Sequence, residues 1–340
     1  MSTLTINLRQ QVTPSSIINA GYTVVFFGLQ LKIAINFAFF HQLTLETLFL
    51  YLIAFKLGEF VNEVSYFGRT RLWVFISVLS IIAATFGSIP LAAIGYFFFG
   101  LSMMRVRDIA ALSSPRVIKY SARAFGFVVA PLIPDSVLVI LLIVSATVAY
   151  IKSAELPHRP SFRVTWPQQT NLFVYVIMML HHAHYFAYAY AIPFIFAERT
   201  SLSPQLMGLV FYSGWAAYNA YEWYLKPRWM WLILGHILAA LALLLVPIAT
   251  TTVSLLTLWF ITGLGGGTVY MLRDLLALQT KQSHQELKIA EGLGHLLGIS
   301  IWFLAMLAQP DTAPFISACA LGVLATIFCI GANQRKPGAP

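Results

Sequence analysis

Long apolar runs, each about the length of a bilayer-crossing helix, recur along the whole of this 340-residue sequence. A helix needs about 20 apolar residues to cross the hydrocarbon core of a membrane. Charged residues make up only 10% of the chain and apolar residues 59%, which leaves too few charges to cover a soluble protein of this size. The composition therefore argues against a water-soluble enzyme, a nucleic-acid binder and a disordered scaffold, and it predicts an all-α polytopic membrane protein.

Charged and turn residues between the apolar runs predict twelve transmembrane helices, six on each side of a polar central stretch that holds three prolines. The expected spans are 17–40, 46–66, 71–88, 90–112, 117–133, 136–151, 171–197, 203–225, 228–249, 252–277, 286–309 and 312–333. The expected organisation is an N-terminal tail (1–16), a six-helix half (17–151), a central loop (152–170), a second six-helix half (171–333) and a C-terminal tail (334–340).

The positive charges support this topology. With the N-terminus placed inside, Arg199 is the only one of the 21 lysines and arginines on an outside loop, while Lys32 and Lys56 fall within spans. Lysine and arginine are enriched in cytoplasmic loops of membrane proteins. Both termini and the central loop are therefore predicted to be cytoplasmic. The net charge of +9 is explained by the concentration of cations on the cytoplasmic side of the lipid bilayer, so no nucleic-acid partner is expected.

Two stretches resemble each other at an offset of 166 residues. Residues 100–112 and 266–278 both contain a glycine, six further residues and then Arg-Asp, namely Arg107-Asp108 and Arg273-Asp274. Together with a weaker match of the ends of the second and eighth spans, this predicts two pseudo-symmetric halves. Parallel repeats of this kind are one known plan of transporters, with the binding site between the halves near mid-membrane.

Six plus six spans, the central loop and the segment Gly68-Arg69-Thr70-Arg71 after the second span resemble the major facilitator superfamily. The resemblance covers about residues 17–333 and implies a secondary transporter of the plasma (bacterial inner) membrane that acts by alternating access. It assigns a cytoplasmic gate to Arg69 and Arg71. The acidic position of the family's loop motif falls on Ser65, so Glu63 or Glu59 would replace the missing acid, and we assign Glu63 to the gate.

Two polar residues of the first span share one helical face, because Lys32 and Asn36 are four residues apart. A charged side chain inside the bilayer is costly and needs a polar cavity or a partner. Lys32 therefore either forms a structural ion pair with an acid of another span or provides a cationic contact for a substrate or a titrating site. We assign Lys32 and Asn36 to substrate binding.

The seventh span contains three histidines and three tyrosines within ten residues, 181–190. His181, Tyr185 and Tyr188 share one face, and His184 stacks over Tyr188. Proton relay, hydrogen bonding to substrate, metal contact and plain interhelical hydrogen bonding are all compatible with this pattern. We assign His181, His184, Tyr185 and Tyr188 to substrate binding. No fixed metal site is expected, because only two of the three histidines can share a face and the remaining ligands would have to come from other spans, while the other histidines are scattered along the sequence.

The eighth span has a polar and aromatic stripe at helical spacing. We assign Trp215 and Asn219 of this stripe to substrate binding, and Glu222 together with His181 to proton coupling. Glu222 could equally be a local partner of Lys226, one turn further on.

The leading functional hypothesis is a proton-coupled secondary transporter of a small solute, with an organic anion or a polar aromatic compound as the expected substrate. One alternative is a transporter of a transition metal or its chelate, and another is a non-transporting assembly factor or receptor on the same scaffold. The sequence has no nucleotide-binding loop and no nucleophile–base pair, so neither a cofactor nor an enzymatic activity is expected. The protein is expected to be a monomer.

Overall fold

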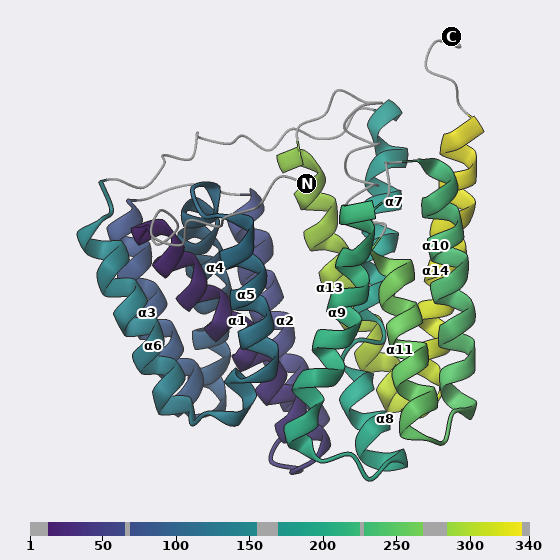
Figure 1. Cartoon of the computed structure of the whole chain (residues 1–340), viewed down its shortest axis with the longest axis horizontal. Helices are drawn as coiled ribbons and strands as arrows, with labels where there is room; N and C mark the ends of the chain where they lie inside the picture. The colour runs from purple at the N-terminus through teal and green to yellow at the C-terminus, as the bar shows by residue number, and fades with distance from the viewer. Residues whose placement is uncertain (1–12, 65–68, 155–168, 225–227, 268–283, 335–340) are drawn as a thin grey trace, which may run out of the picture. The chain divides into compact units, whose positions relative to one another are not determined.

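The structure is a computed structural model that describes residues 13–64, 69–154, 169–224, 228–267 and 284–334. Within these residues all regular secondary structure is helical. The first six helices are α1 (Pro14–Ala38), α2 (Leu45–Val64), α3 (Thr70–Phe86), α4 (Ile89–Leu112), α5 (Arg116–Val128) and α6 (Asp135–Ile151). Each of them begins and ends within a few residues of a predicted span (Figure 1).

The later part of the chain contains α7 (Gln169–Phe186), α8 (Ala191–Arg199), α9 (Met207–Tyr224), α10 (Trp229–Leu245), α11 (Thr252–Gly266), α13 (His284–Ala308) and α14 (Ala313–Gln334). Three 3-10 turns, Ala130–Leu132, Pro204–Leu206 and Val246–Ile248, adjoin α5, α9 and α10. The second Arg-Asp repeat, Arg273-Asp274, lies outside the described residues, as do most of the central loop and most of both tails.

The predicted seventh span is divided into two helices. The chain leaves the α-helical conformation at Ala187 and resumes it at Ala191. Pro193 lies in the first turn of α8 and has no backbone N–H, so the carbonyl of Ala189 cannot receive the usual helical hydrogen bond from it. The sequence interpretation of one continuous span was wrong at this point, although Pro193 was a visible signal.

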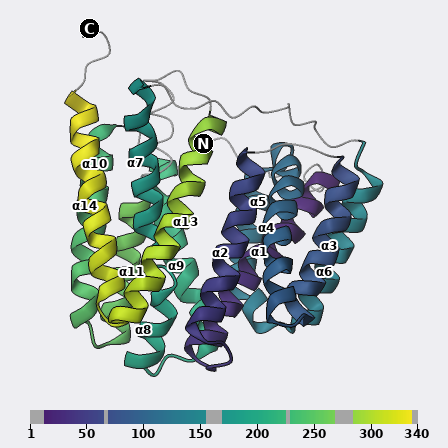
Figure 2. The same ribbon diagram turned by 180° about the vertical axis from the view of Figure 1, so that it is seen from behind.

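The chain forms two compact units. The first contains Met1–Ile33 and Leu57–Phe162, and the second contains Ala34–Lys56 and Arg163–Pro340. Within the first unit, α3 packs against α4 and α6, and within the second, α7 packs against α13 and α14 (Figures 1 and 2). Aromatic pairs explain why Ala34–Lys56 belongs to the second unit: the ring centroids of Phe49 and Phe303 lie 4.2 Å apart.

Exposed apolar side chains cover the outer helices of both units. Phe75 on α3, Val253 on α11 and Leu304 on α13 each expose more than half of their surface. Soluble proteins rarely expose large apolar surfaces, whereas a lipid-facing helix must do so. Five described helices are long and apolar enough to cross a bilayer, and three shorter ones are also apolar. The chain is therefore an integral membrane protein.

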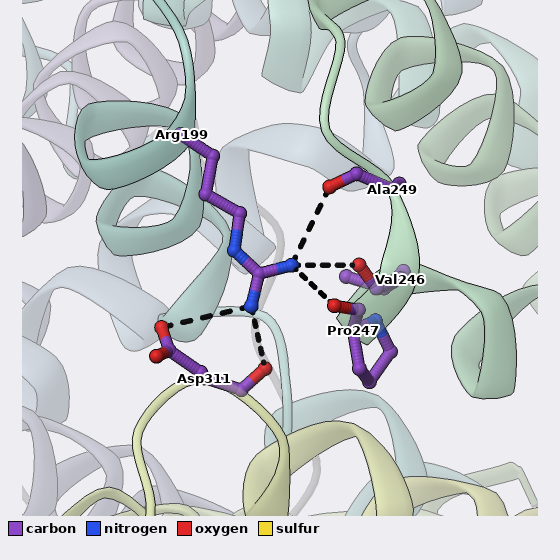
Figure 3. Close-up of polar contacts among 5 residues, drawn as sticks. All are labelled: Arg199, Val246, Pro247, Ala249 and Asp311. Atoms are coloured by element: carbon purple, nitrogen blue, oxygen red, sulfur yellow. Dashed lines mark hydrogen bonds and ion pairs between the residues drawn. The ribbon is translucent and has the colours of Figure 1, made fainter.

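Arg199, the only cation predicted on an outside loop, connects several segments at one end of the second unit. It lies at the end of α8, and its Nη1 donates hydrogen bonds to the carbonyls of Val246, Pro247 and Ala249 at 3.1, 2.7 and 3.4 Å (Figure 3). Its Nη2 lies 3.7 Å from Oδ1 of Asp311, in the turn between α13 and α14. The Arg199 guanidinium thus donates to the carbonyls that follow α10 and links the end of α8 to the segment after α10 and to the turn between α13 and α14.

Replacing Arg199 with glutamine is expected to destabilise the protein by about 1.5–3 kcal/mol, the usual value of hydrogen bonds to a charged group. Lysine at this position should recover only part of the loss, because an ammonium lacks the planar fork of a guanidinium. Thermal unfolding of the purified protein in detergent measures the effect. Arg228→Gln, at an exposed position before α10, is the matched control. Equal melting temperatures for the two variants would show that the contacts of Arg199 do not stabilise the second unit.

Candidate functional site

The three histidines of α7 face three different helices. Successive residues of an α-helix are rotated by about 100° around its axis, so His182 points away from the side of α7 that His181 and His184 share. His181 contacts α10, His182 contacts α13 and His184 contacts α14. All three are buried. The short sequence cluster is therefore the centre of a histidine network within the second unit.

His181 forms a close pair with His236 of α10. Nδ1 of His181 lies 2.7 Å from Nε2 of His236, and Nδ1 of His236 lies 2.8 Å from the carbonyl oxygen of Leu232. A carbonyl oxygen can only accept, so Nδ1 of His236 carries a proton. In neutral His236 the other ring nitrogen then has a lone pair, and His181 must donate to it from Nδ1. The pair has a defined donor–acceptor direction.

His184 and two tyrosines form an aromatic group beside this pair. Nδ1 of His184 donates to the carbonyl oxygen of Ala318 at 2.6 Å, and its ring centroid lies 5.7 Å from that of Tyr188. The two rings are neighbours, as expected from their spacing, but they are tilted by 58° rather than stacked. The Tyr188 ring also lies 5.7 Å from Tyr185 and 6.1 Å from Trp259 of α11. Tyr188 lies in the break between α7 and α8, which helps to explain how it meets α11.

His182 meets two residues of α13. Its Nδ1 lies 3.3 Å from Nε2 of His295, and its Nε2 lies 3.9 Å from a carboxylate oxygen of Glu291. Nε2 of His295 lies 3.9 Å from the other carboxylate oxygen, one helical turn away. One ligand atom from each of these residues can be chosen so that all three lie within 4.8 Å of one another. Two imidazoles and one carboxylate are thus close enough together to share a metal ion.

Two glycines of α13 bring the helices close enough for this contact. A Cβ atom at Gly294 would lie 2.4 Å from the carbonyl oxygen of Met179, and one at Gly298 would lie 2.6 Å from that of Ala183. Glycines four residues apart are a common way for two membrane helices to approach closely. The contacts at Gly294 and Gly298 thus position His295 of α13 against His182 of α7.

Lys32 has an acidic partner within the first unit. Its ammonium forms an ion pair with Asp135, the first residue of α6, and donates to the carbonyl oxygen of Ile133 at 2.5 Å. Of the two alternatives for Lys32, the structure contains the ion pair with another span. Asn36, one turn further along α1, is half-buried, and its predicted role in substrate binding stays a prediction.

The polar stripe of the eighth span lies on α9. Nδ2 of Asn219 donates to the carbonyl oxygen of Trp215 at 2.6 Å, while its Oδ1 is buried without a hydrogen-bond partner among the described residues. The Trp215 ring lies 5.9 Å from that of Tyr212. The backbone of Glu222 belongs to α9, but its side chain lies outside the described residues, so its coupling role stays a prediction.

The predicted gate residues lie at the end of α2 and at the start of α3 in the first unit. Glu63 is buried on α2, and Arg69 is exposed directly before α3. Nε of Arg71 donates to Oγ of Ser153 at 2.9 Å, and its guanidinium lies 5.1 Å from the Tyr150 ring centroid. Arg71 thus connects α3 to the end of α6. Part of the loop motif, residues 65–68, lies outside the described residues.

Sequence reasoning missed His236, His295 and Glu291. The first two were treated as scattered histidines, and Glu291 had no assigned role. The usable signal was that each is an ionisable residue within an apolar span, which is rare unless it faces a polar interior. Spacing along the chain cannot show which spans meet, and for this reason the three residues could not be grouped with those of α7.

Comparison with known proteins supports the fold. No model of a known protein family matches the sequence, and no curated protein is similar to it by sequence. The human organic anion transporter MFSD10 (TETRAN) has a similar structure, with a TM-score of 0.63 and 12% identity over 93% of this chain and 98% of its own. The POT family transporter PepTSo has a TM-score of 0.70 and 10% identity over 94% and 97%.

A third similar structure is that of a bacterial metal transporter, with a TM-score of 0.68 and 14% identity over 98% of this chain and 100% of that one. All three proteins are transporters, which agrees with the expectation that this chain is not an enzyme. The similarity shows that this chain shares the fold of these three structures, in agreement with the predicted all-α membrane protein, while the arrangement of twelve spans in two halves stays a prediction.

Proposed function

We propose that this chain is a secondary transporter of the major facilitator type that moves a small solute in a proton-coupled manner. The fold supports transport, and the buried pair of His181 and His236 is the observation that supports proton coupling. Alternating access by two six-helix halves, a position in a plasma membrane with both termini cytoplasmic, and a monomeric state belong to the same proposal. Histidine is suited to coupling because it exchanges protons near neutral pH.

The donor–acceptor direction of the His181–His236 pair indicates how the pair can hold an additional proton. A proton that reaches Nε2 of His181 makes this imidazole cationic. His181 can then pass its Nδ1 proton across the 2.7 Å contact to Nε2 of His236. The positive charge moves to His236, and His181 returns to neutrality with its proton on Nε2. Since Nδ1 of His236 is held by the Leu232 carbonyl, the proton must leave by the way it came.

The aromatic group beside the pair favours a polar aromatic substrate. Tyr185, Tyr188 and His184 offer ring faces and hydrogen-bonding groups within the second unit, and Asn219 offers a buried amide oxygen. Because Asp135 neutralises Lys32, this lysine is a weaker reason to expect an anion than the sequence suggested. We propose a neutral or weakly charged aromatic compound ahead of a strongly anionic one.

Transport of a transition metal is a second candidate function. The convergence of His182, Glu291 and His295 favours it, and the similar structure of a bacterial metal transporter agrees with it. A chelated metal would fit both the aromatic group and this cluster.

Flux into proteoliposomes tests the proposal. The purified protein is reconstituted and offered aromatic carboxylates, neutral phenols, Zn²⁺ and Mn²⁺, with and without an imposed proton gradient. We expect at least one compound to accumulate only with the gradient and to be released by a protonophore. Liposomes without protein are the control. If no compound shows gradient-sensitive flux and a stable protein partner co-purifies, an assembly factor or receptor replaces the transporter.

A further inference from the structure

We propose that His182, Glu291 and His295 bind a divalent first-row transition-metal ion between α7 and α13. Two imidazoles and one carboxylate are borderline ligands that suit Zn²⁺, Fe²⁺, Co²⁺ or Mn²⁺, whereas Ca²⁺ and Mg²⁺ prefer oxygen alone. The assignment of this ion as cargo rests on the second proposed function. The binding itself does not.

The spacing of the two imidazoles fits a metal ion. Two nitrogens bound to one tetrahedral zinc at about 2.0–2.1 Å lie about 3.3 Å apart. The distance between Nδ1 of His182 and Nε2 of His295 is 3.3 Å. Oε1 of Glu291 is 3.9 Å from Nε2 of His295, whereas the 3.9 Å contact of Oε2 is with Nε2 of His182, the ring nitrogen that does not contact His295. One atom from each residue can be chosen so that all three lie within 4.8 Å of one another, and a rotation of the Glu291 side chain would bring a carboxylate oxygen to an ion between the two imidazoles.

The backbone holds two of the ligands before any ion arrives. Glu291 and His295 are four residues apart on α13 and thus project from one face of that helix. The close approach at Gly294 and Gly298 fixes the distance from this face to His182. A site built on two packed helices needs little rearrangement to bind.

The surroundings of this cluster suit an ion that binds and dissociates. Three protein ligands leave at least one coordination position for water or for a chelating ligand of the ion, as in catalytic zinc sites. The three side chains expose 10%, 23% and 15% of their surface, so the cluster is shielded but not closed.

Two lysines near the cluster would limit its affinity. The ammonium of Lys56 lies 4.7 Å from the centroid of the Phe186 ring, whose centroid lies 4.4 Å from that of His295. Lys288 precedes Glu291 by one turn. Their positive charges oppose a bound cation and would help its release, which a transporter needs and a permanent structural site does not.

Titration of the purified protein with Co²⁺ and Zn²⁺ tests the site without any transport. Visible absorption of Co²⁺ reports nitrogen and oxygen coordination, and calorimetry gives the affinity for Zn²⁺. We expect one ion per chain, and a loss of affinity of at least about 10-fold in His295→Ala and in the nearly isosteric Glu291→Gln. Lys56→Met should bind the ion more tightly.

His41→Asn is the matched control. His41 is exposed between α1 and α2 with a φ of 51°, a conformation that asparagine tolerates, so this variant should bind like the wild type. Gel filtration and thermal unfolding establish that each variant is folded, and Glu291→Gln keeps the test open if His295→Ala does not fold. Unchanged affinity in Glu291→Gln, or no binding by the wild type, overturns the site. Binding without flux of Zn²⁺ or Mn²⁺ keeps the site and removes metal transport.

Discussion

Replacing His236 with asparagine is expected to abolish proton-coupled accumulation while leaving gradient-independent exchange of the same compound. Asparagine can keep a hydrogen bond near His181 but cannot hold the proton that His236 receives across the 2.7 Å contact. A proton that reaches His181 then cannot be passed on to a second basic side chain. We expect proton entry during uptake to fall to the level of protein-free liposomes. A trapped pH-sensitive dye measures it, with uptake of the labelled compound recorded in parallel.

Two variants define the controls for His236. His181→Asn removes the other half of the pair and should give the same uncoupled behaviour, and the double variant should be no worse than either single one, since both act on one event. His41→Asn, which changes an exposed histidine, should transport like the wild type. If His236→Asn still accumulates the compound against its gradient, the pair is only an interhelical hydrogen bond, and coupling must be sought at Glu222.

Hydrophobic periodicity and loop charge predicted the helices well, because the bilayer fixes the length of a span and permits few alternatives. The helix bounds of α4, Ile89–Leu112, match the predicted span 90–112 closely. The break at Ala187–Tyr190 escaped prediction because apolar residues continue through it and only Pro193 marks it. Such breaks are tolerated where neighbouring groups satisfy the backbone, a tertiary property that a single span does not display.

The candidate site could be predicted only in part, for a related reason. The α7 histidines were recognisable because three polar residues in one apolar run are costly without a polar environment. Their partners were not, because His236 and His295 are 55 and 113 residues away from the residues they contact. Lys32 shows the same limit: the sequence predicted an acid or a cavity as its alternatives, but not that the acid is Asp135.

Gly298→Ala is expected to destabilise the second unit clearly, although it adds only one methyl group. The added methyl group would lie 2.6 Å from the carbonyl oxygen of Ala183 and 2.8 Å from Cβ of Phe186. These atoms belong to α7 itself and cannot rotate away, so the two helices must separate. Overpacking of this kind costs about 1–3 kcal/mol, which outweighs the gain of about 0.5–1 kcal/mol in helix propensity.

The same substitution at Gly266 is the matched control for this effect. A methyl group there would lie 3.4 Å from Cδ2 of Tyr218, an ordinary contact, so Gly266→Ala should leave stability unchanged or raise it slightly. Thermal unfolding in detergent compares the two variants, and the affinity for Zn²⁺ gives a second readout. Because separation of α7 from α13 also moves His295 away from His182, Gly298→Ala should weaken metal binding although no ligand is changed. Loss of stability with full metal affinity would show that the glycine contact does not position the cluster.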